Sequence, residues 1–92
     1  MDNETIHIMW HILSKLNRMN KIGGAHTEIK NLGKGLPSSL TSTNKGKKRI
    51  KEAIKELISN EFLLTKPSTG EIHVSLNPRK LKDIREFIVQ HR

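Results

Sequence analysis

The stretch IKEAIKELISNEFLLTKPSTGEIHVSLNP, residues 50–78, changes its hydrophobic period part-way along its length. In the first part, Ile50, Ile54 and Leu57 recur at the spacing of residues that share one face of a helix. Polar and charged residues separate them, so the pattern predicts an amphipathic helix over about residues 45–60. Its apolar stripe fixes which side of this helix faces the core.

The second part of the stretch predicts two β-strands joined by a tight turn. FLL at residues 62–64 begins an apolar strand, and EIHVSL at residues 71–76 alternates apolar and polar side chains. Between them, KPSTGE supplies a proline and a glycine, which are typical of a turn. A two-stranded hairpin is therefore expected directly after the helix.

The remaining residues after the hairpin, NPRKLKDIREFIVQHR at 77–92, predict a closing helix. Asn77 suits the N-cap and Pro78 suits the first helical position, and together they form a strong start signal. The apolar face of this helix is formed by Leu81, Ile84, Phe87 and Ile88.

Residues 4–19 predict a first helix with an unusually broad apolar surface. Its apolar residues cover an arc of roughly 200°, about twice the width expected of a helix that lies on a single core. Two explanations are open for this arc. Either other elements of the chain surround the helix, or part of its surface meets a second subunit.

The segment between the first helix and the helix of residues 45–60 is less regular. Ala25, Ile29 and Leu32 are spaced as on one helical face and predict a short second helix of two turns at most. Residues 33–43 are rich in Gly, Pro, Ser and Thr, so they are expected to form a loop. Two alternatives are open: the second helix extends further, or a short helical turn lies around residues 38–42.

This order of elements resembles the winged helix-turn-helix superfamily, and in particular its small bacterial and archaeal transcriptional regulators. The resemblance rests mainly on residues 50–78, where an amphipathic helix precedes an apolar strand, a short wing and a returning strand. One departure is the distance of about ten residues between the second and third predicted helices, where the motif usually has 3–4.

The resemblance implies a mainly α fold with a small β-hairpin (α+β class). A single domain over residues 1–92 would contain three helices, a two-stranded wing and a C-terminal helix. The helix of residues 45–60 would enter the major groove of DNA, with the 65–71 hairpin as the wing.

The charge of the chain independently favours an anionic partner. The net charge is +8 over 92 residues. Residues 1–43 hold five Lys/Arg and three Asp/Glu, for +2, whereas residues 44–92 hold twelve and six, for +6. Such a one-sided excess of cations is typical of proteins that bind nucleic acid.

The positions of these cations are more informative than their number. Lys45, Lys47, Lys48 and Arg49 occupy the start of one predicted helix, and further cations follow Pro78 at the start of the last. The N-terminus of a helix carries a partial positive charge, so each cation there costs about 0.3–1 kcal/mol. Binding of phosphate gives a physical reason for this unfavourable placement.

Double-stranded DNA is the favoured nucleic acid because the chain lacks exposed aromatic residues on which single-stranded bases could stack. Its only aromatic residues besides histidine are Trp10, Phe62 and Phe87, and each lies on an apolar face. Arg49 is expected to pair with guanine and Asn44 with adenine.

Glu52 is expected to accept a hydrogen bond from cytosine. Four lysines, Lys45, Lys48, Lys55 and Lys66, better suit contacts with backbone phosphates. The full set of predicted DNA-binding residues is Asn44, Lys45, Lys47, Lys48, Arg49, Lys51, Glu52, Lys55, Lys66, Arg79 and Lys80.

A homodimer built by the first and last helices is expected, because both carry apolar residues in excess. The competing hypothesis is a winged-helix interaction module that docks an acidic protein partner. No catalytic motif or glycine-rich phosphate loop is present, so neither an enzyme nor a bound cofactor or small ligand is predicted.

Metal binding and membrane insertion are not expected either. His7 and His11 are spaced to share a metal ion, but no third ligand accompanies them, so they are interpreted as exposed structural histidines. There is no cysteine, which excludes disulfides and thiolate metal sites. No apolar run approaches the ~20 residues of a membrane span, and the N-terminus is unlike a signal peptide, so a cytoplasmic protein is predicted.

Overall fold

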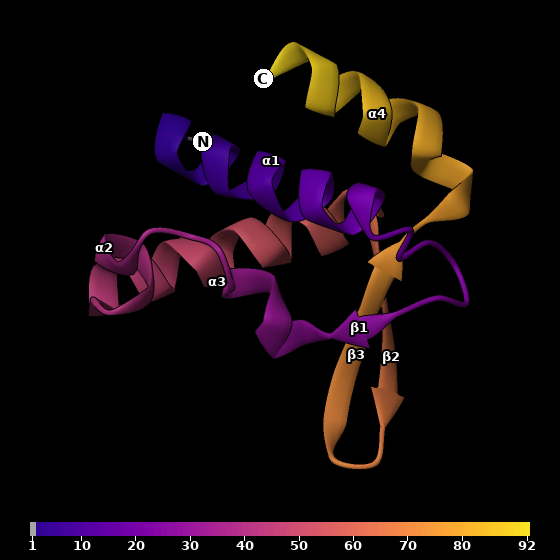
Figure 1. The fold of residues 1–92 in the computed structure, drawn as a ribbon, viewed down its shortest axis with the longest axis horizontal. Coiled ribbons are helices and arrows are strands. Elements are labelled where there is room, and N and C mark those ends of the chain that lie inside the picture. Colours follow the sequence, from indigo (N-terminus) through magenta and orange to yellow (C-terminus); the bar gives the residue numbers. More distant parts are fainter. Residues whose placement is uncertain (1) are drawn as a thin grey trace.

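The structure is a computed structural model that describes residues 2–92 as four α-helices, two 3₁₀ turns and three β-strands (Figure 1). The predicted α+β class is confirmed at this level. In chain order the elements are α1 (Asn3–Arg18), β1 (Thr27–Glu28), η1 (Ile29–Gly33), α2 (Ser38–Thr41), α3 (Asn44–Ser59), β2 (Leu63–Ser68), β3 (Glu71–Leu76), η2 (Pro78–Lys80) and α4 (Leu81–Gln90).

The sheet has three antiparallel strands in the order β1–β3–β2, where the sequence predicts two. The predicted hairpin is confirmed, because β2 and β3 pair from Leu63 opposite Leu76 to Ser68 opposite Glu71. The third strand, β1, lies on the other edge of β3, with Thr27 opposite Val74.

The prediction of a short helix from Ala25, Ile29 and Leu32 is wrong. The chain there is extended through β1 and then enters the 3₁₀ turn η1. A helix of two turns gains few hydrogen bonds for the cost of nucleation, whereas the open edge of β3 offers partners to the backbone. Leu32 nevertheless enters the core and is 1% exposed.

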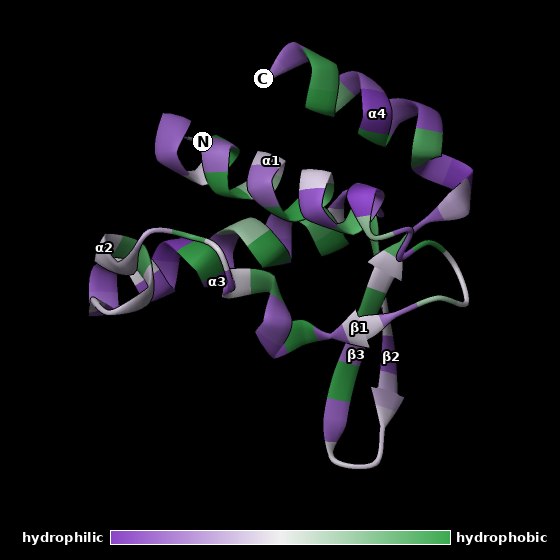
Figure 2. Ribbon diagram, viewed as in Figure 1, coloured by the Kyte–Doolittle hydropathy of each residue, from purple (hydrophilic) through white to green (hydrophobic). Residues whose placement is uncertain are grey.

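The broad apolar surface of α1 is explained by its position between α3 and α4 (Figure 1). Hydrophobic and hydrophilic segments alternate along each of these helices in Figure 2. On α4, the Ile88 carbonyl accepts a hydrogen bond of 3.0 Å from Trp10 Nε1. The apolar residues of α1 that are fully enclosed in this way are Ile8, Met9, Ile12, Leu13 and Leu16.

The first of the two explanations for the apolar arc therefore holds, because other elements of the same chain surround α1. The surplus apolar surface that suggested a dimer through the first and last helices is largely covered within one chain. Val89 on α4 is the main exception, at 59% exposed.

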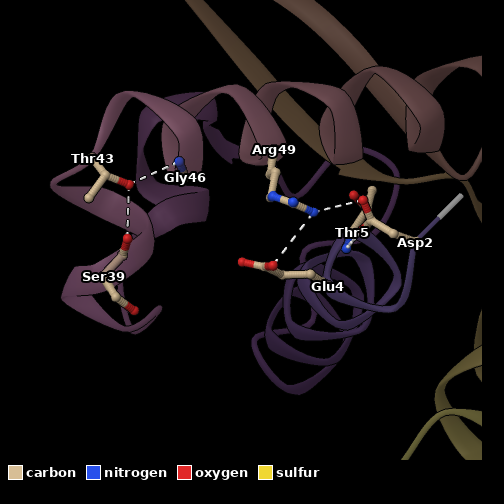
Figure 3. A network of polar contacts seen from close by, with 7 residues as sticks. All are labelled: Asp2, Glu4, Thr5, Ser39, Thr43, Gly46 and Arg49. Carbon is tan, nitrogen blue, oxygen red and sulfur yellow. Dashed lines mark hydrogen bonds and ion pairs between the residues drawn. The ribbon is translucent and has the colours of Figure 1, made fainter.

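The single helical turn α2 lies directly before α3 and confirms the alternative interpretation of residues 38–42. Ser42 and Thr43 alone separate the two helices, so the apparent ten-residue gap disappears. Thr43 Oγ1 accepts a hydrogen bond of 3.0 Å from the Gly46 amide and donates one of 2.9 Å to the Ser39 carbonyl (Figure 3). Thr43 is therefore the N-cap of α3.

Gly46 allows α2 and α3 to approach each other closely. A Cβ atom at this position would lie 2.1 Å from the carbonyl oxygen of Leu40. No side chain can occupy that space, so a glycine is required in the first turn of α3.

Asn77 fastens the end of the hairpin to the end of α3. Its side chain accepts a hydrogen bond of 3.1 Å from the Arg79 amide, which confirms the predicted N-cap, and its Nδ2 donates one of 2.9 Å to the Glu61 carbonyl. The closing helix starts as the 3₁₀ turn η2 before it continues as α4. Glu61 itself has a φ of 63°, which lets the chain reverse after α3.

Candidate nucleic-acid interface

The charged residues of α3 fall on two different sides of the helix. Ala53 and Leu57 point into the core and are fully buried. At 100° per residue, one stripe on the outer side is basic, and a second stripe lies toward α1. The basic stripe, which we call the lysine face, consists of Asn44, Lys47, Lys48, Lys51 and Lys55, and all five residues are exposed.

The lysine face lies on the side of α3 that borders η1. Lys51 and Lys55 line a shallow groove of about 370 Å³ together with Ile29 of η1 and the apolar residues Ile54 and Ile58 of α3. No acidic residue lines this groove. The two lysines of the groove are therefore open to solvent, and no carboxylate in the groove lining neutralises their charge.

The second stripe contains Lys45, Arg49, Glu52 and Glu56 and faces the start of α1. Glu52 and Glu56 line a hollow together with Thr5 of α1 and with Lys55 of the lysine face, and Lys45 lines another together with Glu4. The second stripe is therefore of mixed charge, whereas the lysine face contains four lysines and no acidic residue.

Arg49 does not belong to the lysine face, although the sequence predicts it as the main base reader. Its Nη1 atom lies 2.7 Å from Asp2 Oδ2 and 3.5 Å from Glu4 Oε2 (Figure 3). The Arg49 side chain is only 23% exposed. The guanidinium therefore joins α3 to the first turn of α1.

Asp2 is fixed from two directions at this junction. It is the N-cap of α1, and its Oδ1 atom accepts a hydrogen bond of 2.7 Å from the Thr5 amide. The hydrogen bonds from Thr5 and, to a smaller extent, the charge of Arg49 hold the pKa of the Asp2 carboxyl below its ordinary value. Asp2 is thus a charged partner for Arg49 at neutral pH.

The predicted hairpin residue Lys66 lies in a different setting. On the sheet it is opposite His73, which is opposite Glu28 of β1, so the three side chains form a row on one face. His73 also contacts His26, and their Nδ1 atoms are 2.7 Å apart. Desolvation, followed by the charges of His73, Lys66 and Lys21, holds the pKa of His26 below its ordinary value.

Arg79 and Lys80 lie far from the N-terminal end of the lysine face. They form η2, which follows Asn77, and Asn77 is bonded to the residues just after the C-terminal end of α3. The 16 residues of α3 make it about 24 Å long, so these two cations lie roughly that far from its N-terminal lysines. They are not part of one continuous surface with Asn44 and Lys48.

Comparisons of the chain with protein-family models, with curated proteins and with solved structures find no match. Between residues 2 and 92, no helix combines the length and the apolar character needed to cross a bilayer. In the same part of the chain, no three His, Cys, Asp or Glu side chains gather as they would around a metal ion.

The two histidines of α1, His7 and His11, have different partners. His7 stacks on Trp10, with ring centroids 6.0 Å apart, whereas His11 Nε2 lies 3.3 Å from the Lys34 carbonyl oxygen. Sequence reasoning treated the other histidines as scattered and missed the contact between His26 and His73. These two residues are 47 positions apart, so only the register of β1 against β3 could have revealed it.

Proposed function

We propose that this chain is a winged-helix protein that binds double-stranded DNA through the lysine face of α3. The observation that carries the proposal is the separation of charge on α3. Four lysines share the outer stripe, while the acidic residues of the helix lie on the stripe toward α1. A helix that displayed lysines only for solubility would not need this division, whereas a phosphate backbone interacts favourably with a purely basic stripe.

The arrangement around α3 supports the winged-helix interpretation. A short helix, a tight turn and a longer helix are the parts of a helix-turn-helix, in which the second helix enters the major groove. Here α2, two linking residues and α3 follow this order, and Gly46 keeps the two helices in close contact. The β2–β3 hairpin then extends away from α1 and α4 (Figure 1), as a wing would.

The aromatic side chains support duplex DNA over single-stranded nucleic acid. Trp10 is bonded to the Ile88 carbonyl, and the rings of Phe62 and Phe87 contact each other at 6.4 Å between centroids. These three are the only Trp, Phe or Tyr residues of the chain. None of them is available on the lysine face as a platform for an unpaired base.

The position of Arg49 changes which residues are expected to contact bases and which are expected to contact phosphates. Lys48 and Asn44 lie in the N-terminal half of the lysine face and are the better candidates for base contacts. Lys47, Lys51 and Lys55 suit phosphates on either side of the groove. Arg49 would have to leave Asp2 before it could reach a base.

We extend the proposal to transcriptional regulation on the strength of the resemblance to small winged-helix regulators. A homodimer would present two copies of α3 to half-sites about 34 Å apart. Because most apolar residues of α1 are enclosed within one chain, a dimer through the first and last helices would rely on the apolar residues that stay exposed there, Val89 of α4 and Met19 at the end of α1.

Fluorescence anisotropy with a labelled duplex, over a series of salt concentrations, tests the proposal. The unaltered chain is expected to bind with an affinity that falls steeply as salt rises. Replacing Lys47 and Lys51 together by Ala should reduce the slope of log K against log salt by about 2, because two phosphate contacts are lost.

The matched control removes the same charge from α4 and the residues after it, on the far side of α1 (Lys82→Ala with Arg92→Ala). This control should change the slope little. Equal effects of the two double substitutions, or no binding at low salt, would overturn the proposal.

A further inference from the structure

A small cavity lies between the loop after α1 and the β2–β3 hairpin. It has a volume of about 280 Å³. Its lining includes Gly23 and Gly24 of the loop, His26, and the hairpin residues Lys66 and His73. The lysine face is no part of this lining, so the cavity is a separate feature of the fold.

The two histidines of the cavity share a single hydrogen. Their Nδ1 atoms are 2.7 Å apart and their rings are nearly perpendicular, at 78°. A neutral imidazole carries one N–H, so one Nδ1 must donate to the other. When a proton is added, the pair gains a positive charge and a further N–H donor beside the cavity.

The charged groups around the pair are mostly positive on the cavity side. Lys66 lies opposite His73, and both Lys66 and Lys21 act on His26 as neighbouring cations. The acidic groups lie toward β1, where Glu28 is 2.9 Å from Lys30 Nζ and also neighbours Glu71. Two carboxylates are also near, Glu28 opposite His73 and Glu71 beside Glu28, but Glu28 is paired with Lys30 and neither carboxylate lines the cavity. Two imidazoles and Lys66 in the lining disfavour a metal cation and favour an anion.

We propose that this cavity binds a phosphate group through His26, His73 and Lys66. The group could belong to the DNA backbone, in which case the inference rests on the proposed function, or to a small phosphorylated molecule. Lys66 contributes a permanent charge, and the imidazole pair contributes its full charge only when it is protonated. A backbone phosphodiester keeps its charge between pH 8 and pH 6, so its binding draws a proton onto the pair and becomes tighter as the pH falls.

The test uses two probes, inorganic phosphate and a labelled DNA duplex, each at pH 8 and pH 6 with EDTA present. Histidine ring signals in NMR spectra report the phosphate probe, and anisotropy reports the duplex. The variant combines His26→Asn with His73→Asn. The control is His7→Asn, which changes an exposed histidine on α1, and thermal unfolding checks that each variant is folded.

If the phosphate belongs to DNA, affinity for the duplex should rise about threefold to tenfold from pH 8 to pH 6, with the salt slope steeper by about 0.9. The double variant should lose both effects, and His7→Asn should keep them. If the phosphate belongs to a small molecule, inorganic phosphate should shift the His26 and His73 signals at pH 6, while the duplex shows neither effect.

The proposal is overturned if phosphate moves neither ring signal and the double variant has the same pH dependence and salt slope as the unaltered chain. A different result is expected if the chain does not bind DNA at all. In that case no duplex binds at either pH, and the phosphate probe still decides whether the cavity takes an anion.

Discussion

Arg49 Nη1 on α3 lies 2.7 Å from Asp2 Oδ2 at the start of α1, so the only arginine of α3 is committed to a contact within the fold. The same carboxylate caps α1 through the Thr5 amide. One acidic residue therefore both starts a helix and fixes its angle to the next. The consequence is that the cations of α3 have two roles, with Arg49 in packing and the lysine face directed outward.

Replacing Arg49 by Ala should therefore affect stability more than affinity for DNA. We expect a lower melting temperature, because Asp2 and Glu4 lose their partner, and a change in duplex affinity of less than about twofold. Lys48→Ala should do the reverse, with a loss of affinity of about threefold to tenfold at low salt and an unchanged melting temperature. Thermal unfolding and anisotropy on both variants check these two outcomes. A loss of affinity of more than about twofold for Arg49→Ala would indicate that Arg49 contacts a base after all.

Asp2→Asn separates the two roles of Asp2, because asparagine is as good an N-cap as aspartate but carries no charge. The pKa of Asp2 is lowered in the fold from its ordinary value of 3.8. Its charge therefore stabilises the fold above that value, and the contribution is lost as the pH falls below it. We expect the melting temperature of the unaltered chain to drop more than that of Asp2→Asn between pH 5 and about pH 3. Parallel curves for the two proteins would contradict the link between Asp2 and Arg49.

Gly46→Ala should be among the most damaging single substitutions in the chain. The added Cβ would lie 2.1 Å from the Leu40 carbonyl oxygen, so α2 must move away from α3. Overpacking of this kind typically costs about 1–3 kcal/mol. Gly33→Ala is the matched control, because a Cβ there meets nothing within 4 Å. Urea unfolding of both variants measures the difference, and similar midpoints would show that α2 is not held against α3 in solution.

The sequence predicts the long periodic elements well and the short ones poorly. The apolar spacing of α1 and α3 and the alternation of β3 each repeat often enough to define an element, and all three are confirmed. The two residues of β1 and the four of α2 are too few for the period of a strand or a helix to repeat, and tertiary contacts decide their conformation. The helix predicted from Ala25 to Leu32 fails for this reason.

The site was predictable only where it depends on a helical face. The lysine face follows from spacing within α3 once the core side is known. The partner of Arg49 is 47 residues away, as is the partner of His26, and no local pattern encodes either contact. Such long-range contacts decide which of the predicted cations are available to a ligand.

Protonation of His26 should destabilise the fold. Its pKa is lowered from the ordinary value of 6.5, mainly by desolvation and then by the charge of His73, so the folded chain binds this proton less readily than the unfolded chain. The contribution of neutral His26 to the stability of the fold is therefore complete above pH 6.5 and is lost as the pH falls below that value. The melting temperature should therefore decrease between pH 7 and pH 5, and His26→Asn should reduce that decrease while His7→Asn leaves it unchanged. An equal decrease in all three proteins would mean that the pair of histidines is not formed in solution.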